Sequence, residues 1–226
     1  MLYTFIDPPS ERDIKLACDV LTSGGTLAYP TDVNWAFGCD AANPKALDKI
    51  KKLKPCHPKD RPFSLICDSI SMAASVATID SQTYRLLRRA LPGPFTVILP
   101  ASKSLPKQLH EKRTTVGVRI PDSPLLLAIT AQFGKPLATT SVPSISELST
   151  HTPPNSKKNL ARNLCPVIQD IPRFGYEVQE HFGHALDIIL DLGDEIPASE
   201  TTVIDLTSFP PMLVRQGVGD LALFDL

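Results

Sequence analysis

Apolar residues recur at helical spacing in four segments of the chain. In residues 10–23, Ser10 and Asp13 form a capping-box pattern at the start of an apolar face. Pro44 and Pro124 stand near the start of two further segments, where proline is compatible with the first helical turn. The spacing predicts helices over residues 10–23, 44–54, 80–90 and 123–133.

Shorter apolar runs, bounded by Gly or Pro, predict strands between and after these helices. The predicted strands are TLAYPT (26–31), FSLIC (63–67), PGPFTVILPA (92–101, a turn leading into a strand), TTVGVRIP (114–121), PLATTS (136–141), ALDIILDLG (185–193), TTVIDLT (201–207) and PMLVRQG (211–217). Strands interleaved with helices, and three strands bunched at the end, predict an α/β (α+β) fold with a mixed sheet.

One region departs from this pattern. Residues 143–175 are polar, contain Pro and Asn, and are only weakly periodic. They are predicted to form a long excursion with one short helix around 156–164. With no repeat and no linker elsewhere, residues 1–226 are expected to form a single domain.

The composition indicates a globular protein with a substantial core, since 42% of the 226 residues are hydrophobic and 21% are charged. No apolar run approaches the roughly 20 residues of a membrane span, and the first residues lack the features of a secretory signal. The five cysteines are Cys18, Cys39, Cys56, Cys67 and Cys165. They form no CxxC pair, which favours buried, reduced thiols and a cytoplasmic location.

The net charge of −1 indicates no particular partner, but basic residues gather in two places. They are Lys49, Lys51, Lys52, Lys54, Lys59 and Arg61 in one segment, and Lys103, Lys107, Lys112 and Arg113 in the other. This clustering predicts a local positive face. The lysines of the first segment are equally compatible with an ordinary solvated helix face.

Polar residues also stand at the ends of predicted strands, where sheet proteins usually bind ligands. They are Thr31, Asp32, Arg119, Thr139, Thr140, Ser141, Thr201, Thr202 and Arg215. Arginine and lysine beside hydroxyl groups suit phosphate or carboxylate. Each residue has a structural alternative: the arginines pair with carboxylates such as Asp122 or Asp205, the threonines favour strands, and Asp32 caps a turn.

The sequence contains no GxGxxG, GxxxxGK[ST] or GxSxG motif. His181 and His184 have a possible ligand spacing, but no cysteine or second acidic ligand accompanies them. We therefore expect no metal site.

Six segments, in their order and spacing, resemble the YrdC/YciO family. They are GGTLAYPTDVNWAFGCDA, LPGPFTVILPA, TVGVRIPDSPLLLAI, GKPLATTS, TTVIDLT and MLVRQGVGD. The resemblance covers residues 10–222, and the basic segment, the missing SAN motif and the wording EKRTTVGVRIP are most similar to the YciO branch. It implies a twisted mixed sheet with flanking helices around a large, positively charged cavity.

The resemblance also implies two activities. Family synthases condense L-threonine, bicarbonate and ATP into L-threonylcarbamoyl-AMP and release pyrophosphate, the first step towards threonylcarbamoyladenosine in tRNA. The family fold is also associated with binding double-stranded RNA. The implied ligands are ATP or AMP with Mg²⁺, without a tightly bound cofactor, and duplex RNA or tRNA.

Residue roles carry over by motif. Thr31 and Asp32 stand in the PT-x-T element, Arg119 at the family arginine that faces threonine, and Arg215 near the nucleotide. The substrate and nucleotide candidates are Thr31, Asp32, Lys52, Lys54, Arg61, Arg119, Thr139, Ser141, Thr202 and Arg215. The RNA-binding candidates are Lys49, Lys51, Lys59, Lys112 and Arg113.

Several family positions are altered. Val33 replaces the second threonine of PT-x-T, Trp35 a tyrosine, and Lys54 the arginine of K-x-R, so that Lys59 or Arg61 could supply the charge instead. Pro143 replaces the asparagine of T-S-x-N. If the nucleotide group that this asparagine would bind stayed buried without a partner, binding would weaken by on the order of 1–3 kcal/mol.

These departures favour a cavity protein that binds nucleotide or RNA, with weak or altered synthase activity. The alternative is an active synthase in which other groups compensate. A third, less favoured hypothesis is a non-catalytic partner that docks through residues 143–175.

Overall fold

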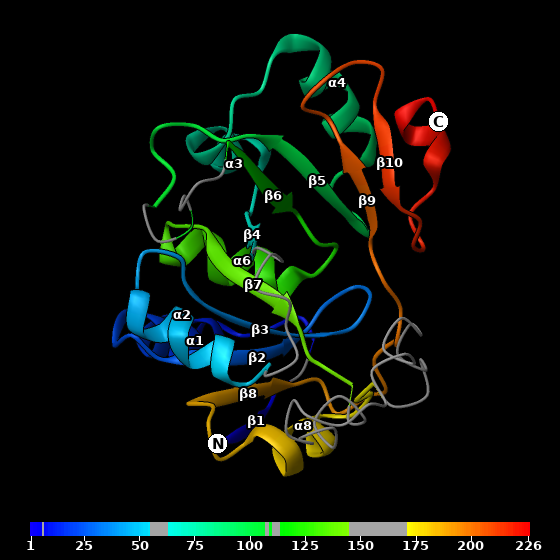
Figure 1. Cartoon of the computed structure of the whole chain (residues 1–226). Coiled ribbons are helices and arrows are strands. Elements are labelled where there is room, and N and C mark those ends of the chain that lie inside the picture. Colours follow the sequence, from blue (N-terminus) through cyan, green and yellow to red (C-terminus); the bar gives the residue numbers. More distant parts are fainter. Residues whose placement is uncertain (6, 55–62, 107–108, 110–113, 145–170) are drawn as a thin grey trace, which may run out of the picture.

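Ten strands form one sheet in the computed structural model, which describes residues 1–5, 7–54, 63–106, 109, 114–144 and 171–226. The sheet order is β1-β8-β2-β3-β7-β4-β6-β5-β9-β10 (Figure 1). The strands are β1 (Leu2–Thr4), β2 (Thr26–Pro30), β3 (Trp35–Asp40), β4 (Ser64–Ile66), β5 (Phe95–Pro100), β6 (Thr115–Arg119), β7 (Leu137–Ser141), β8 (Ile188–Asp191), β9 (Thr202–Asp205) and β10 (Met212–Arg215). Parallel pairs such as β2–β8 and antiparallel pairs such as β2–β3 both occur, which confirms the predicted mixed sheet.

Helices flank the sheet on both sides. They are α1 (Glu11–Thr22), α2 (Pro44–Lys52), α3 (Ile70–Val76), α4 (Ser81–Ala90), α6 (Pro124–Phe133), α8 (Gly175–Phe182) and the 3-10 helix η3 (Leu221–Phe224). All four helices predicted from apolar spacing are present, and the capping box of Ser10 and Asp13 forms at the start of α1. None of the described helices is both long and apolar enough to cross a bilayer. The helix predicted around 156–164 lies outside the described residues.

Some elements carry a weak signal in the sequence, notably β3, which was not predicted. All of β3 except its last residue is buried, so the strand shows no alternation of polar and apolar positions. Gly38 stands in its middle and lowers strand propensity. The short elements β1, α3, α8 and η3 were missed as well, because too few residues are involved to show a period.

The two faces of the sheet are covered unequally. Helices α1 and α6 pack on one face over Tyr29 and Leu137, whereas α2, α3, α4 and α8 pack on the other. On the first face, Ser64, Gly117 and Val203 remain half-buried, although their strand neighbours are fully buried. We call this uncovered part, across β4, β6, β5 and β9, the open face.

A close contact next to the open face predicts a sensitive position. Tyr29 lies over Gly38, and a Cβ atom at Gly38 would clash with the Tyr29 hydroxyl oxygen. Gly38→Ala is expected to lower the free energy of unfolding by about 1–2 kcal/mol, because the buried tyrosine must move. Denaturant titration measures this. Gly117→Ala is the control, since its Cβ would meet nothing closer than the Ser64 hydroxyl at 3.1 Å. Equal losses in both variants would contradict the explanation.

Three cysteines are described, and all three are free and buried. Cys56 and Cys165 lie outside the described residues. Burial raises the pKa of the Cys39 and Cys67 thiols to about 12, so the reactive thiolate is disfavoured. In the folded protein at mildly alkaline pH, both are expected to resist iodoacetamide while the denatured chain reacts. Peptide mass mapping distinguishes the two states, and modification of Cys39 at equal rates in both would contradict the prediction.

Candidate functional site

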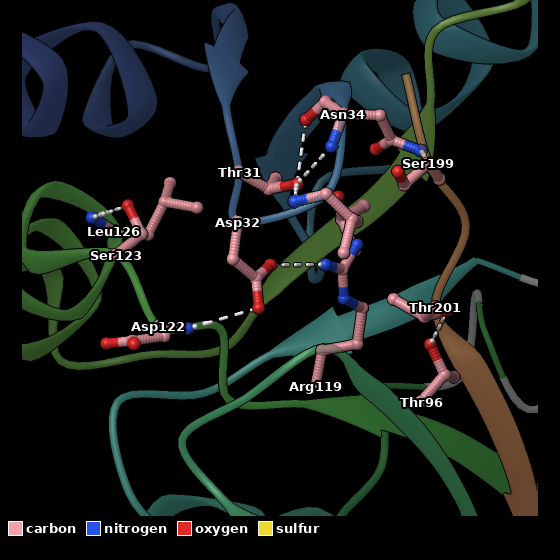
Figure 2. Close-up of polar contacts among 12 residues, drawn as sticks. Thr31, Asp32, Asn34, Thr96, Arg119, Asp122, Ser123, Leu126, Ser199 and Thr201 are labelled. Carbon is pink, nitrogen blue, oxygen red and sulfur yellow. Dashed lines mark hydrogen bonds and ion pairs between the residues drawn. The ribbon is translucent and has the colours of Figure 1, made fainter. Parts of the chain in front are cut away.

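The turn between β2 and β3 presents Asp32 to the rest of the sheet. Pro30 ends β2, and the Thr31 hydroxyl oxygen accepts the N–H groups of Val33 at 3.2 Å and Asn34 at 3.1 Å. The same hydroxyl donates to the carbonyl oxygen of Asn34 at 2.7 Å. Thr31 is thus a turn-forming residue, and its hydroxyl closes the loop that carries Asp32 (Figure 2).

Arg119 at the end of β6 forms an ion pair with Asp32. Its Nη2 lies 3.0 Å from Asp32 Oδ1, and the two side chains are only 8% and 10% exposed. The other carboxylate oxygen of Asp32 accepts the backbone N–H of Asp122 at 3.3 Å. A carboxylate partner such as Asp122 was the structural alternative for Arg119. The arginine does pair with a carboxylate, but that carboxylate is Asp32, and Asp122 contacts the pair only through its backbone N–H.

Part of the Arg119 guanidinium has no partner among the described residues. Its Nε is buried and makes no hydrogen bond to any of them. Burial lowers the pKa of the Arg119 guanidinium, the nearby charge of Asp32 opposes this, and the charge of Arg215 adds to it. A buried donor of this kind normally finds a partner, so the geometry leaves a position for an acceptor atom.

Arg215 supplies the second guanidinium of the site. A shift of register between Leu213 and Arg215 marks a bulge in β10, and such bulges re-aim side chains. The Nη2 of Arg215 donates to the carbonyl oxygen of Thr201 at 2.9 Å and to its hydroxyl oxygen at 3.1 Å. Its Nη1 pairs with Glu200 at 3.1 Å, so the structural alternative of a carboxylate partner is met by Glu200 and not by Asp205. Its Nε is buried and makes no hydrogen bond within the described part of the chain.

The segment before β9 joins the two arginines. The Asn34 side-chain amide donates to the carbonyl oxygen of Ser199 at 2.9 Å, and the Ser199 N–H donates to Val33 at 2.9 Å. The Thr96 and Thr201 hydroxyls lie 2.9 Å apart (Figure 2). We call Asp32, Arg119, Thr201 and Arg215 the central site. Asn34 and Thr96 were not predicted; the only signal for Asn34 was its place in the TDVNW turn.

Two predicted residues are engaged elsewhere. Thr139 accepts from the Tyr29 hydroxyl at 3.0 Å and donates to the Phe37 carbonyl at 3.2 Å, inside the sheet. Thr202 donates to the Gly219 carbonyl and accepts from the Gly217 N–H, both at 3.0 Å. Both hydroxyls are buried and occupied, so these threonines brace the sheet and the loop after β10.

A second group of predicted residues meets at the end of β7. Lys54 Nζ lies 2.7 Å from the Ser141 carbonyl oxygen and 3.4 Å from its hydroxyl, and 3.1 Å from the Thr140 hydroxyl. The altered K-x-R and T-S-x-N elements are therefore in direct contact. Lys52 is exposed on α2. Arg61, Lys59, Lys112 and Arg113 lie outside the described residues.

The fold and the central site together define a class of protein. It is an α/β protein whose mixed sheet carries a buried, ion-paired arginine and a second arginine beside its open face. The central site thus combines the turn after β2 with the ends of β6 and β10 and the segment before β9.

Comparison with known proteins gives the family. The family model Sua5_yciO_yrdC, described as telomere recombination, matches residues 19–175. The chain is 30% identical over 223 residues to YciO of Escherichia coli (strain K12), an uncharacterized protein, covering 98% of this chain and 97% of YciO. The chain belongs to the Sua5/YciO/YrdC family. This confirms the predicted resemblance.

Solved structures agree. The crystal structure of E. coli YciO aligns with a TM-score of 0.80 at 29% identity, over 99% of this chain and 98% of that one. P. abyssi Sua5 complexed with L-threonine aligns with a TM-score of 0.77 at 26% identity, over 96% of this chain and 57% of that one. A threonylcarbamoyl-AMP synthase of Pyrococcus abyssi is 28% identical over 208 residues, covering 92% of this chain and 54% of the relative.

Proposed function

We propose that the central site binds the substrates of a threonylcarbamoyl-AMP synthase-like reaction, and that the activity is weak or altered. One observation carries the proposal: the Arg119 guanidinium is nearly fully buried, and its Nε has no hydrogen-bond partner in the part of the chain that the structure describes. The relatives that are threonylcarbamoyl-AMP synthases, and the related structure complexed with L-threonine, support the reaction class. We place the reaction in the cytoplasm, as part of tRNA modification.

In this proposal the two arginines of the central site bind different anionic groups of the substrates. Arg119 would donate to the carboxylate of threonine, while Asp32 holds the guanidinium in place. Arg215, whose Nε is also unpartnered, would donate to a phosphate oxygen of ATP or AMP. The reaction joins threonine, bicarbonate and the adenylyl group of ATP, and it releases pyrophosphate and water, so positioning and charge neutralisation dominate. Mg²⁺ would arrive bound to the phosphates of ATP.

The proposal of weak or altered activity is supported by two changed residues near the end of β7, Pro143 and Lys54. Pro143 offers no side-chain donor or acceptor where the synthases carry asparagine. Lys54 replaces an arginine and already donates to Ser141, so it offers neither a bidentate fork nor a free ammonium there.

Incubation with ATP, L-threonine and bicarbonate, followed by a pyrophosphate assay, tests the reaction. We expect slow release that requires L-threonine, and a thermal shift with ATP and L-threonine. A ligand at 100 times its dissociation constant stabilises by about 2.7 kcal/mol. The control is the double variant Asp32→Leu/Arg119→Met, which removes both charges together. No shift with either ligand would contradict the site, and fast turnover would contradict the weak activity.

Duplex RNA is a second proposed ligand, supported by the outward face of α2. Lys49 pairs with Asp187 at 2.7 Å and Lys51 with Asp48 at 3.2 Å, whereas Lys45 and Lys52 are exposed and have no carboxylate partner among the described residues. Such lysines suit recognition of a phosphate backbone by shape and charge. Titration with duplex RNA at low salt tests it: Lys45→Gln/Lys52→Gln is expected to weaken binding, and no binding by the unaltered protein would exclude it.

A further inference from the structure

A pocket of about 650 Å³ lies away from the central site, beside α4. Its walls are α4, the segment between β9 and β10, and the residues after η3; Figure 1 shows these segments next to each other, with the C-terminus. Leu86 and Leu87 of α4 pack into the same core cluster as Val118, on the face of β6 opposite to Arg119. The sheet therefore separates this pocket, which we call the α4 pocket, from the central site.

The α4 pocket carries an excess of positive charge. Arg89 is fixed in its wall, because it pairs with Asp225 at 3.0 Å and donates to the Leu223 carbonyl at 2.8 Å. Arg85 and Arg88 also line the pocket, are exposed, and have no hydrogen bond or carboxylate partner within the described part of the chain. Their spacing of three residues places them on one side of the helix. Two guanidinium groups are therefore available to one anionic ligand.

Aromatic rings accompany these arginines. Tyr84 on α4 is 45% exposed and Phe209 before β10 is 38% exposed, and both line the pocket. Large aromatic side chains usually bury their rings, and two such rings beside free arginines are typical of surfaces on which nucleobases stack. Pro211 adds a third apolar wall.

We propose that the α4 pocket is a second binding site, which takes a nucleoside phosphate, either free or as part of a single-stranded oligonucleotide. Arg85 and Arg88 supply the fork geometry for the phosphate, and Tyr84 and Phe209 supply flat surfaces for the base. A volume of about 650 Å³ lies within the range of small-ligand sites, which is about 300–1,000 Å³. This inference does not depend on the proposed function of the central site.

Calorimetric titration uses the central-site variant Asp32→Leu/Arg119→Met with AMP, inorganic phosphate and a short single-stranded oligonucleotide. Because this variant keeps Arg215, the α4 pocket is reported by the effect of further substitutions at Arg85 and Arg88, which leave Arg215 unchanged. We expect AMP to bind, and Arg85→Gln/Arg88→Gln in this background to weaken AMP at least ten-fold. Arg12→Gln is the matched control, an exposed arginine of α1 outside the pocket, and is expected to change nothing. Circular dichroism verifies that the variants are folded, and the same titration of the unaltered protein gives the reference affinity. Tighter binding of the oligonucleotide than of AMP would identify a polynucleotide as the source, and equal binding a free nucleotide.

Three results would overturn the proposal. The first is the absence of AMP and oligonucleotide binding in both the unaltered protein and the Asp32→Leu/Arg119→Met variant. The second is AMP binding that Arg85→Gln/Arg88→Gln leaves unchanged. The third is inorganic phosphate binding as tightly as AMP with no effect of Tyr84→Ala, which would leave an anion site without base recognition.

Discussion

Asp32→Ala is expected to lower the free energy of unfolding by about 3–5 kcal/mol, because it leaves the Arg119 charge buried without its partner. The pair is the only ion pair among the described residues in which both side chains are buried. The substitution also removes the acceptor for the Asp122 N–H. Equilibrium denaturation in guanidinium chloride measures the effect.

Asp19→Ala is the matched control, since Asp19 pairs with Lys15 at a shorter distance, 2.7 Å, but in side chains that are 63% and 68% exposed. A helix-surface pair of this kind is worth about 0.3–0.5 kcal/mol. Asp32→Leu/Arg119→Met removes both buried charges and is expected to recover most of the loss. If Asp32→Ala cost no more than Asp19→Ala, Arg119 would have another source of compensation, and its role as a preorganised anion donor would fail.

Local patterns were enough to predict most of the secondary structure. The caps and apolar spacing of α1, α2, α4 and α6 act within one or two turns, so the sequence states them directly. β3 was missed because it is buried on both faces and contains Gly38, which is required only by the tyrosine on the next strand. That contact depends on the register of β2 against β3, which no local pattern contains.

In the central site, too, the residues could be predicted from local motifs, whereas their partners could not. Motifs predicted Thr31, Asp32, Arg119 and Arg215, but the partner of Arg119 is 87 residues away in the chain and is set by the sheet order. Thr201 and Thr202 are adjacent in the sequence, yet the pleat turns Thr201 towards Arg215 and Thr202 towards the loop after β10. Which of two neighbouring hydroxyls faces a site follows from register and not from residue type.

Pro143→Asn is expected to raise the affinity for ATP by about 5-fold to 150-fold, because it supplies a donor and an acceptor worth on the order of 1–3 kcal/mol. The position is well held: β7 ends at Ser141, the Val142 N–H donates to the Trp35 carbonyl at 2.9 Å, and Pro143 is buried. Proline donates no backbone hydrogen bond, so its replacement breaks none. Titration with ATP and the pyrophosphate assay measure affinity and turnover.

Pro143→Ala separates the two changes made by this substitution. Alanine removes the ring and adds a backbone N–H as asparagine does, but it supplies no side-chain amide. Both variants are expected to lose about 0.4–1 kcal/mol of stability from the greater freedom of the unfolded chain. Only Pro143→Asn is expected to gain affinity. An equal gain in both variants would assign the effect to the backbone. No gain in either would contradict the proposal that Pro143 weakens the synthase reaction.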